Sequence, residues 1–98
     1  MTSRTPALHT LKIKHQYLSD ISLGLKTFEL RKNDRDYQVG DVIQFLDIDH
    51  DLSPYKTLYG IVYILKDVPY YGLDPDYCIL GIRKLTEIPP VLLKKVNK

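Results

Sequence analysis

The stretch that decides the fold reads GLKTFELRKNDRDYQVGD and spans residues 24–41. Residues 27–31 alternate, with two apolar side chains on one face of a predicted strand and Thr27, Glu29 and Arg31 on the other. The rest of the stretch is rich in Asn, Asp and Gly, which is typical of a loop. The sequence therefore predicts a strand that carries charges on one face and leads into a long polar turn.

The segment before this strand predicts a strand and then a helix. Residues 9–15 alternate, so Leu11 and Ile13 lie on one face and lysines on the other, as in a strand with one wet face. Gly24 follows the helical segment at the position of a left-handed C-cap. The apolar residues of about two helical turns are Tyr17, Leu18, Ile21 and Leu25.

Three more strands are predicted after the polar turn, at residues 42–49, 57–66 and 77–85. The second is mostly apolar, so we expect burial on both faces near its middle, with Gly60 as a bulge or bend. Pro54 excludes a central strand from the segment between the first two, which is predicted to be a turn.

The predicted order of elements is therefore β-α-β-β-β-β, with five strands and one early helix. This is an α+β chain that is mainly β. Short strands, tight turns and glycines within strands favour a small closed or half-closed barrel. A single crossover helix excludes a doubly wound α/β fold.

Composition predicts one ordinary globular domain. The chain has 98 residues, of which 44% are hydrophobic and 27% charged, and a net charge of +2. Because the net charge is so small, nucleic-acid binding would have to come from a local basic patch. We expect a flexible arm at residues 1–8, a domain at 9–86 and a basic tail at 87–98.

The single cysteine, Cys78, cannot form an intrachain disulfide, and it alternates within an apolar strand as a small buried hydrophobe does. No apolar stretch has the length of a signal peptide or of a membrane span. We therefore expect a cytoplasmic protein that does not contact a membrane.

Lys26, Glu29 and Arg31 are the first candidates for a functional site. Glu29 and Arg31 share a strand face, and Lys26 lies at the junction before the strand, where an irregular backbone allows it to reach the same side. The two cations can hold a phosphate while the carboxylate binds a base amino group. In a dry site the lysine could instead act as a base or nucleophile. The structural alternative is an exposed strand face with compensating charges.

Two further groups could extend this site. Asn33 suits a turn from which Lys32 and Arg35 project, so that the basic residues contact phosphates at a rim. Tyr70 and Tyr71 lie in a predicted loop, where they could stack on bases or close one end of the barrel as core residues.

Acidic residues at alternate positions, Asp47, Asp49 and Asp51, superficially suggest a calcium loop. The pattern fails, because Leu52 stands where such a loop needs Gly and Leu58 stands where it needs Glu. We interpret these residues as the acidic end of a strand.

The histidines, His9, His15 and His50, are scattered, and no pair has the spacing of metal ligands. Nucleotide-binding and hydrolase fingerprints are also missing from the sequence. We therefore expect no metal and no cofactor.

Gly24, Lys26, Glu29 and Arg31 form the pattern G-x-K-x-x-E-x-R, which resembles the signature of the ASCH domain, a group within the PUA-like β-barrels. The stretches FELRKNDRDYQVGD, VYILK and GLDPDYCILGI resemble more narrowly a compact subfamily of uncharacterised ASCH-like proteins from bacteria and phages. The resemblance covers about residues 9–83.

The resemblance implies a PUA-like five-stranded pseudo-barrel with a cleft between helix and sheet, and it implies RNA or nucleotide binding in that cleft. Lys26 and Arg31 would supply positive charge, and Glu29 would accept a hydrogen bond or orient the lysine. One departure is the segment SPYKTLYG, which replaces a Thr-Gly-Arg-like turn of the subfamily. The resemblance therefore implies that a basic contact of the subfamily is shifted to Lys56 here or lost.

Some ASCH-like relatives are amidohydrolases that deacylate N4-acetylcytidine with a lysine, a threonine and a glutamate. Lys26 matches the lysine. Glu29 stands three residues later, where the threonine would fall. Thr27 follows Lys26 directly, but its alternation along the strand is opposite to that of Lys26. An amidohydrolase is therefore the alternative function, and a protein-interaction domain of a mobile element is a second alternative. In each case we expect a monomer.

Overall fold

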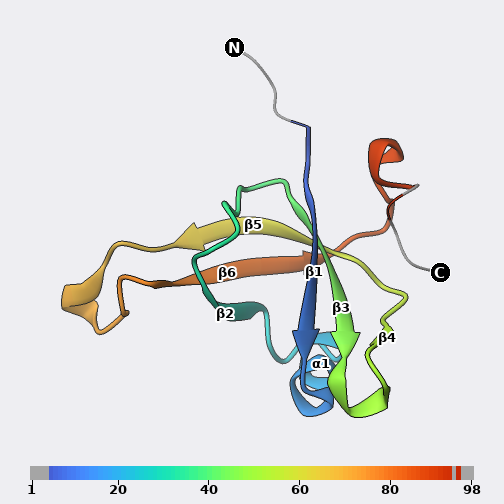
Figure 1. Cartoon of the computed structure of the whole chain (residues 1–98), viewed down its shortest axis with the longest axis horizontal. Helices are drawn as coiled ribbons and strands as arrows, with labels where there is room; N and C mark the ends of the chain where they lie inside the picture. Colours follow the sequence, from blue (N-terminus) through green and yellow to red (C-terminus); the bar gives the residue numbers. More distant parts are fainter. Residues whose placement is uncertain (1–4, 94, 96–98) are drawn as a thin grey trace.

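Six strands form one curled mixed sheet in the order β1-β3-β5-β6-β2, with β4 paired to β3 (Figure 1). The structure is a computed structural model that describes residues 5–93 and 95. The strands are β1 (Leu8–Ile13), β2 (Phe28–Lys32), β3 (Val42–Asp47), β4 (Ser53–Pro54), β5 (Tyr59–Leu65) and β6 (Tyr77–Lys84). The helix is α1 (His15–Ser22), and the 3-10 turns are η1 (Ile48–His50), η2 (Pro69–Tyr71) and η3 (Pro90–Leu92).

The predicted architecture is confirmed as a mainly β half-barrel with one early helix and the order β-α-β-β-β-β. β1 and β3 are parallel, and the other pairs are antiparallel. The structure adds β4, a two-residue strand within the segment predicted as a turn. Pro54 is tolerated there because β4 lies at an edge and pairs only with the end of β3.

Gly24 ends the helix as predicted. Its φ of 78° is left-handed, and its amide donates to the carbonyl of Ile21 while the amide of Leu25 donates to Asp20. This pair of bonds is the Schellman motif, which satisfies carbonyls that the last helical turn leaves without partners. The helix packs inward through Leu18 and Ile21. After Gly24 the chain turns and continues into β2.

The core lies on the concave side of the sheet. Its main cluster joins residues of β1, α1, β3, β5 and β6, with Ile43, Phe45, Cys78 and Leu80 completely buried. The prediction for Cys78 is therefore confirmed. A second cluster packs Leu92 of η3 against β3 and the segment before β5.

The prediction that the middle of β5 is buried on both faces is wrong. Val62 and Tyr63 are 46% and 64% exposed. β3 pairs only with the first two residues of β5, and Ile61 bonds to Gly40 and Asp41 just before β3. Beyond Ile61, β6 is the one strand paired with β5 among the described residues, and the two strands project as a hairpin (Figure 1). A β-bulge lies between Ile61 and Tyr63, at Val62, two residues beyond the expected glycine. Opposite it, Gly81 is packed so closely that a Cβ would lie 3.2 Å from the Cβ of Tyr63.

The chain ends are described in part. Residues 1–4 of the predicted arm, and residues 94 and 96–98 of the predicted tail, lie outside the described residues. Within the described part of the chain, no helix is long and apolar enough to cross a membrane.

Candidate functional site

β2 turns its charged face inward. Glu29 is only 4% exposed and pairs across the sheet with Leu80, which is completely buried, whereas Phe28 and Leu30 are about half exposed. The interpretation of this face as a solvated surface with compensating charges is therefore wrong. Alternation along the strand separates the two faces correctly, but the charged face is the one that closes toward the barrel interior.

Two cations hold the Glu29 carboxylate, one on each oxygen. Lys26 Nζ donates to Oε1, and Arg31 Nε donates to Oε2 at 2.8 Å. The side chains of both cations are about one-fifth exposed, so the group is partly shielded from water. The prediction that Lys26 reaches the same side as Glu29 is confirmed. A carboxylate has about four lone-pair positions, so Glu29 retains capacity to accept from a bound ligand.

Arg31 and Arg35 also connect the two ends of the sheet. β1 and β2 are the terminal strands of the sheet order, and the guanidinium of Arg31 donates to the carbonyl of Lys12 at 2.7 Å. Arg35 donates to the carbonyl of Thr10 at 3.0 Å. These side chains satisfy carbonyls on the outer edge of β1 in place of a neighbouring strand. The half-barrel is therefore bridged by arginines at this seam.

Aromatic rings flank the ammonium group of Lys26. Its nitrogen lies 5.1 Å from the ring centroid of Tyr17 and 5.4 Å from that of Phe28, within the range of a cation–π contact. Both rings are exposed to about the same extent, 42% and 46%. They therefore present apolar faces at an accessible surface next to fixed charge.

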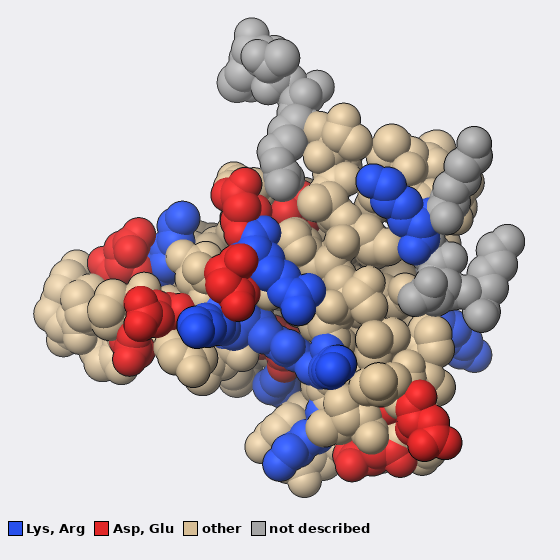
Figure 2. Space-filling view, viewed as in Figure 1, with Lys and Arg blue, Asp and Glu red and all other residues tan. Residues whose placement is uncertain are grey.

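These side chains line a cleft of about 430 Å³ between β1, the start of α1 and β2. The residues that line it are Lys12, Ile13, Lys14, Tyr17, Lys26, Phe28, Glu29, Leu30, Arg31 and Lys32. They include five cations and one carboxylate, so the cleft is far more positive than the chain as a whole. Figure 2 shows Lys and Arg side chains gathered across the middle of the face where β1 and β2 lie.

A smaller cleft of about 260 Å³ adjoins the first, and Lys26 lines both. Thr27 lines the smaller cleft and Glu29 the larger one. The three residues of the hydrolase alternative, Lys26, Thr27 and Glu29, lie within four positions of the sequence, but they do not face one space.

The predicted rim is partly assembled. Lys32 lines the large cleft, and Arg35 contacts β1. Asn33 is exposed, and its backbone N–H donates to the backbone carbonyl of Asp76. Only Lys32 among these three residues lines the cleft itself.

Tyr70 and Tyr71 lie in η2 at the tip of the projecting β5–β6 hairpin, and they do not line the cleft (Figure 1). They are 76% and 80% exposed, with ring centroids 4.5 Å apart. The alternative in which they close the barrel as core residues is therefore wrong. Their rings are accessible, as stacking would require, but at a place separate from Lys26.

Sequence reasoning missed a buried polar cluster around Asp41. The Asp41 carboxylate accepts from the amides of Ala7 and Gln38 at 3.1 Å and contacts His9 Nε2 at 2.8 Å. The His9 ring lies 4.7 Å from that of Tyr37, where burial raises the pKa of the tyrosine against the lowering effect of nearby arginines. The Val-Gly-Asp turn was the available signal, since a buried Asp after a left-handed glycine binds backbone amides.

Taken together, the fold and the cleft define a small mainly β half-barrel domain with a basic, aromatic-edged groove at the seam between its terminal strands. A family model matches residues 8–82, and the chain therefore belongs to the DUF3850 family, described as a domain of unknown function. Its structure is similar to the crystal structure of hypothetical protein PH0355, with a TM-score of 0.56 and 14% identity over 80% of this chain and 99% of that one. No curated protein matches the sequence.

Proposed function

We propose that this domain binds single-stranded RNA or a nucleotide in the large cleft, as its resemblance to ASCH domains implies. The observation that carries the proposal is the convergence of Lys26 and Arg31 on the nearly buried carboxylate of Glu29 inside a concave site. An accidental cluster of surface charges would be solvated on a convex face and would not be sequestered in this way.

The cleft offers a partner for each part of a nucleotide. Exposed lysines at its edge, Lys12, Lys14 and Lys32, suit phosphates. The rings of Tyr17 and Phe28 provide apolar faces for a base. Glu29, held in one orientation by two donors, can accept from an exocyclic amino group and so favour bases that carry one.

The test is a fluorescence anisotropy titration of a labelled single-stranded RNA at two salt concentrations. We expect saturable binding that weakens with salt, because each phosphate contact contributes a slope of roughly −0.7 in log K against log salt for single strands. Lys32→Ala should lower the affinity and the slope. Lys95→Ala, which removes the same charge from an exposed site outside the cleft, should change neither. A response that does not saturate, or equal effects of the two substitutions, would contradict the proposal.

The hydrolase alternative rests on one observation, the position of Lys26 between the two clefts. In it, Lys26 would act as nucleophile or base on an acylated nucleoside such as N4-acetylcytidine, with Thr27 and Glu29 beside it. The engagement of Lys26 with Glu29 and the opening of Thr27 to the other cleft favour binding over catalysis. Incubation with N4-acetylcytidine followed by chromatography decides between them, since catalysis requires product above the level of Lys26→Ala.

A further inference from the structure

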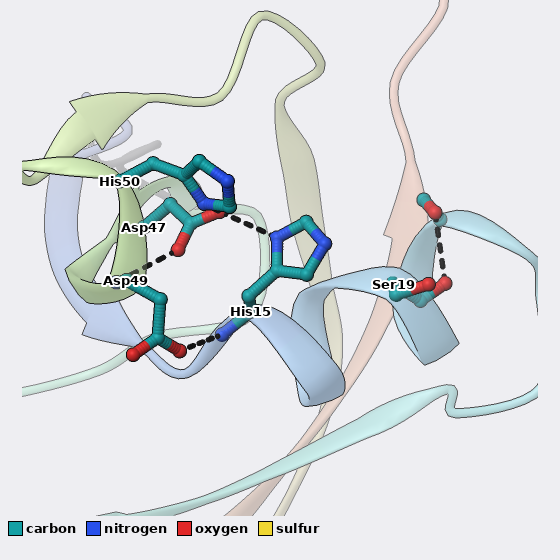
Figure 3. A network of polar contacts seen from close by, with 6 residues as sticks. His15, Ser19, Asp47, Asp49 and His50 are labelled. Carbon is teal, nitrogen blue, oxygen red and sulfur yellow. Dashed lines mark hydrogen bonds and ion pairs between the residues drawn. The ribbon is translucent and has the colours of Figure 1, made fainter.

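Two histidines and an aspartate converge where β1 and β3 end, at the bottom of Figure 1 and outside the cleft; Figure 3 shows them from close by. His15 Nδ1 lies 2.7 Å from Asp47 Oδ2, and His50 Nδ1 lies 3.0 Å from the same oxygen. The ring centroids of the two histidines are 4.7 Å apart. The three candidate ligand atoms all lie within 4.8 Å of one another. The expectation that the histidines are scattered is therefore wrong for this pair.

The fold explains why residues so distant in sequence meet. β1 and β3 run parallel, with Ile13 opposite Asp47, so the carboxyl ends of both strands lie at one edge of the sheet. β1 continues into α1, which begins at His15, and β3 continues into η1, which ends at His50. Sequence spacing could not reveal this pairing, because it depends on the register of two strands separated by β2.

A second set of contacts holds the aspartate in place. Its other oxygen, Oδ1, accepts from the amide of Asp49 at 3.0 Å and so caps η1. The carboxylate of Asp49 in turn accepts from the amide of His15 at 2.9 Å, which ties the start of α1 to η1. Metal ligands in proteins are oriented by outer hydrogen bonds of this kind. Asp47 is nearly buried, whereas both histidine rings are more than half exposed, so an ion could enter from solvent.

We propose that His15, Asp47 and His50 bind one late first-row divalent metal ion, for which Zn²⁺ is the probe. Imidazole nitrogens and a carboxylate oxygen are ordinary Zn²⁺ ligands, with bonds of about 2.0–2.2 Å that place neighbouring ligand atoms of a tetrahedral site roughly 3.3–3.6 Å apart. The distances from Asp47 Oδ2 to the two nitrogens are slightly shorter than this, so small side-chain adjustments open the site. Water completes the coordination sphere on the exposed side. The set contains two nitrogen ligands and no cage of oxygens, so it disfavours Ca²⁺ and Mg²⁺.

The experiment uses full-length protein without a histidine tag, treated with chelator and titrated with Zn²⁺ by calorimetry at neutral pH. We expect one equivalent to bind, and Co²⁺ to give a visible absorption spectrum of a nitrogen- and oxygen-ligated ion. His15→Ala and His50→Ala should each weaken binding at least about tenfold, since even outer-shell substitutions cost 10–100-fold. Both rings are largely exposed, so these variants should retain the fold, which circular dichroism verifies.

Asp51→Asn is the matched control. Asp51 is exposed, follows His50 directly and supplies no ligand atom to the proposed site. Its substitution by asparagine removes the same charge as Asp47→Asn. We expect Asp47→Asn to weaken binding at least tenfold and Asp51→Asn to leave it within about twofold. Absence of saturable binding in the wild type would overturn the proposal and leave the group as a hydrogen-bonded clasp. Equal binding by a double variant lacking both histidines, or equal effects of the two aspartate substitutions, would overturn it as well.

Discussion

Replacing Glu29 with glutamine tests whether the centre of the cleft is a sequestered ion-pair group. Two charge-assisted hydrogen bonds end on this carboxylate, and each such bond contributes about 1.5–3 kcal/mol. The glutamine retains one neutral acceptor, and water recovers part of the loss because Lys26 and Arg31 are about one-fifth exposed. We expect the free energy of unfolding to fall by about 2–3 kcal/mol, which corresponds to a decrease in Tm of roughly 10–20 °C for a domain of this size.

Urea denaturation followed by circular dichroism measures the effect, with an unchanged m-value as the condition for comparing midpoints. Glu87→Gln is the control, because Glu87 is exposed and a surface substitution of this kind changes stability by no more than about 0.5 kcal/mol. A double-mutant cycle with Lys26→Met should give a coupling free energy of about 1–2 kcal/mol. A loss below about 0.5 kcal/mol for Glu29→Gln would mean that the carboxylate is solvated, which would contradict a sequestered ion-pair group in the cleft.

Three other substitutions or treatments follow from the structure. Gly24→Ala should cost about 1–2 kcal/mol in urea denaturation, because φ is 78° while no atom lies within 4 Å of the added Cβ; a neutral result would mean that this backbone relaxes. Burial alone would raise the pKa of Asp47, but its hydrogen bonds and the nearby histidine charge hold the pKa below the ordinary 3.8. In metal-free protein this carboxylate therefore stabilises the fold above pH 3.8, and that contribution is lost as the pH falls through the lower folded-state pKa. Asp47→Asn should flatten the acid limb of a Tm–pH curve, and an unchanged limb would contradict this. Burial also raises the pKa of the Cys78 thiol, so a disulfide reagent at pH 8 should modify the folded protein on the order of 100-fold more slowly than the urea-unfolded chain; similar rates would show that the strand opens readily.

The elements of the fold could be predicted because their signals are local. Alternation located the strands, and Gly24 located the end of the helix, since only the backbone and immediate neighbours decide these features. β4 and the exposure of Tyr63 were not predictable in the same way. They depend on how far β3 extends beside β5, and this is a property of strand register that no single segment carries.

The site was predictable in its members but not in its orientation. Spacing placed Glu29 and Arg31 on one face of β2, yet apolar side chains on the opposite face gave no reason to expect the charged face inside. The inward face is determined by β1, whose open edge supplies carbonyl acceptors for arginines that are far away in sequence. The contact of His15 with Asp47 was also not predictable from spacing. It depends on the parallel pairing of β1 and β3, which brings these two residues together.

If the cleft binds a ligand as proposed, the arginine bridge would couple that binding to the stability of the fold. Arg31 donates at once to Glu29 and to the carbonyl of Lys12, so a ligand that draws its guanidinium away weakens the seam between the terminal strands. Lys32 lines the same cleft from an exposed position, with no hydrogen bond from its side chain among the described contacts. Substituting Lys32 should therefore change affinity and leave stability intact, whereas substituting Arg31 should change both. If the two substitutions changed affinity and stability to the same extent, the seam would be independent of the cleft. The contrast would separate a residue that only contacts the proposed ligand from one that also closes the half-barrel.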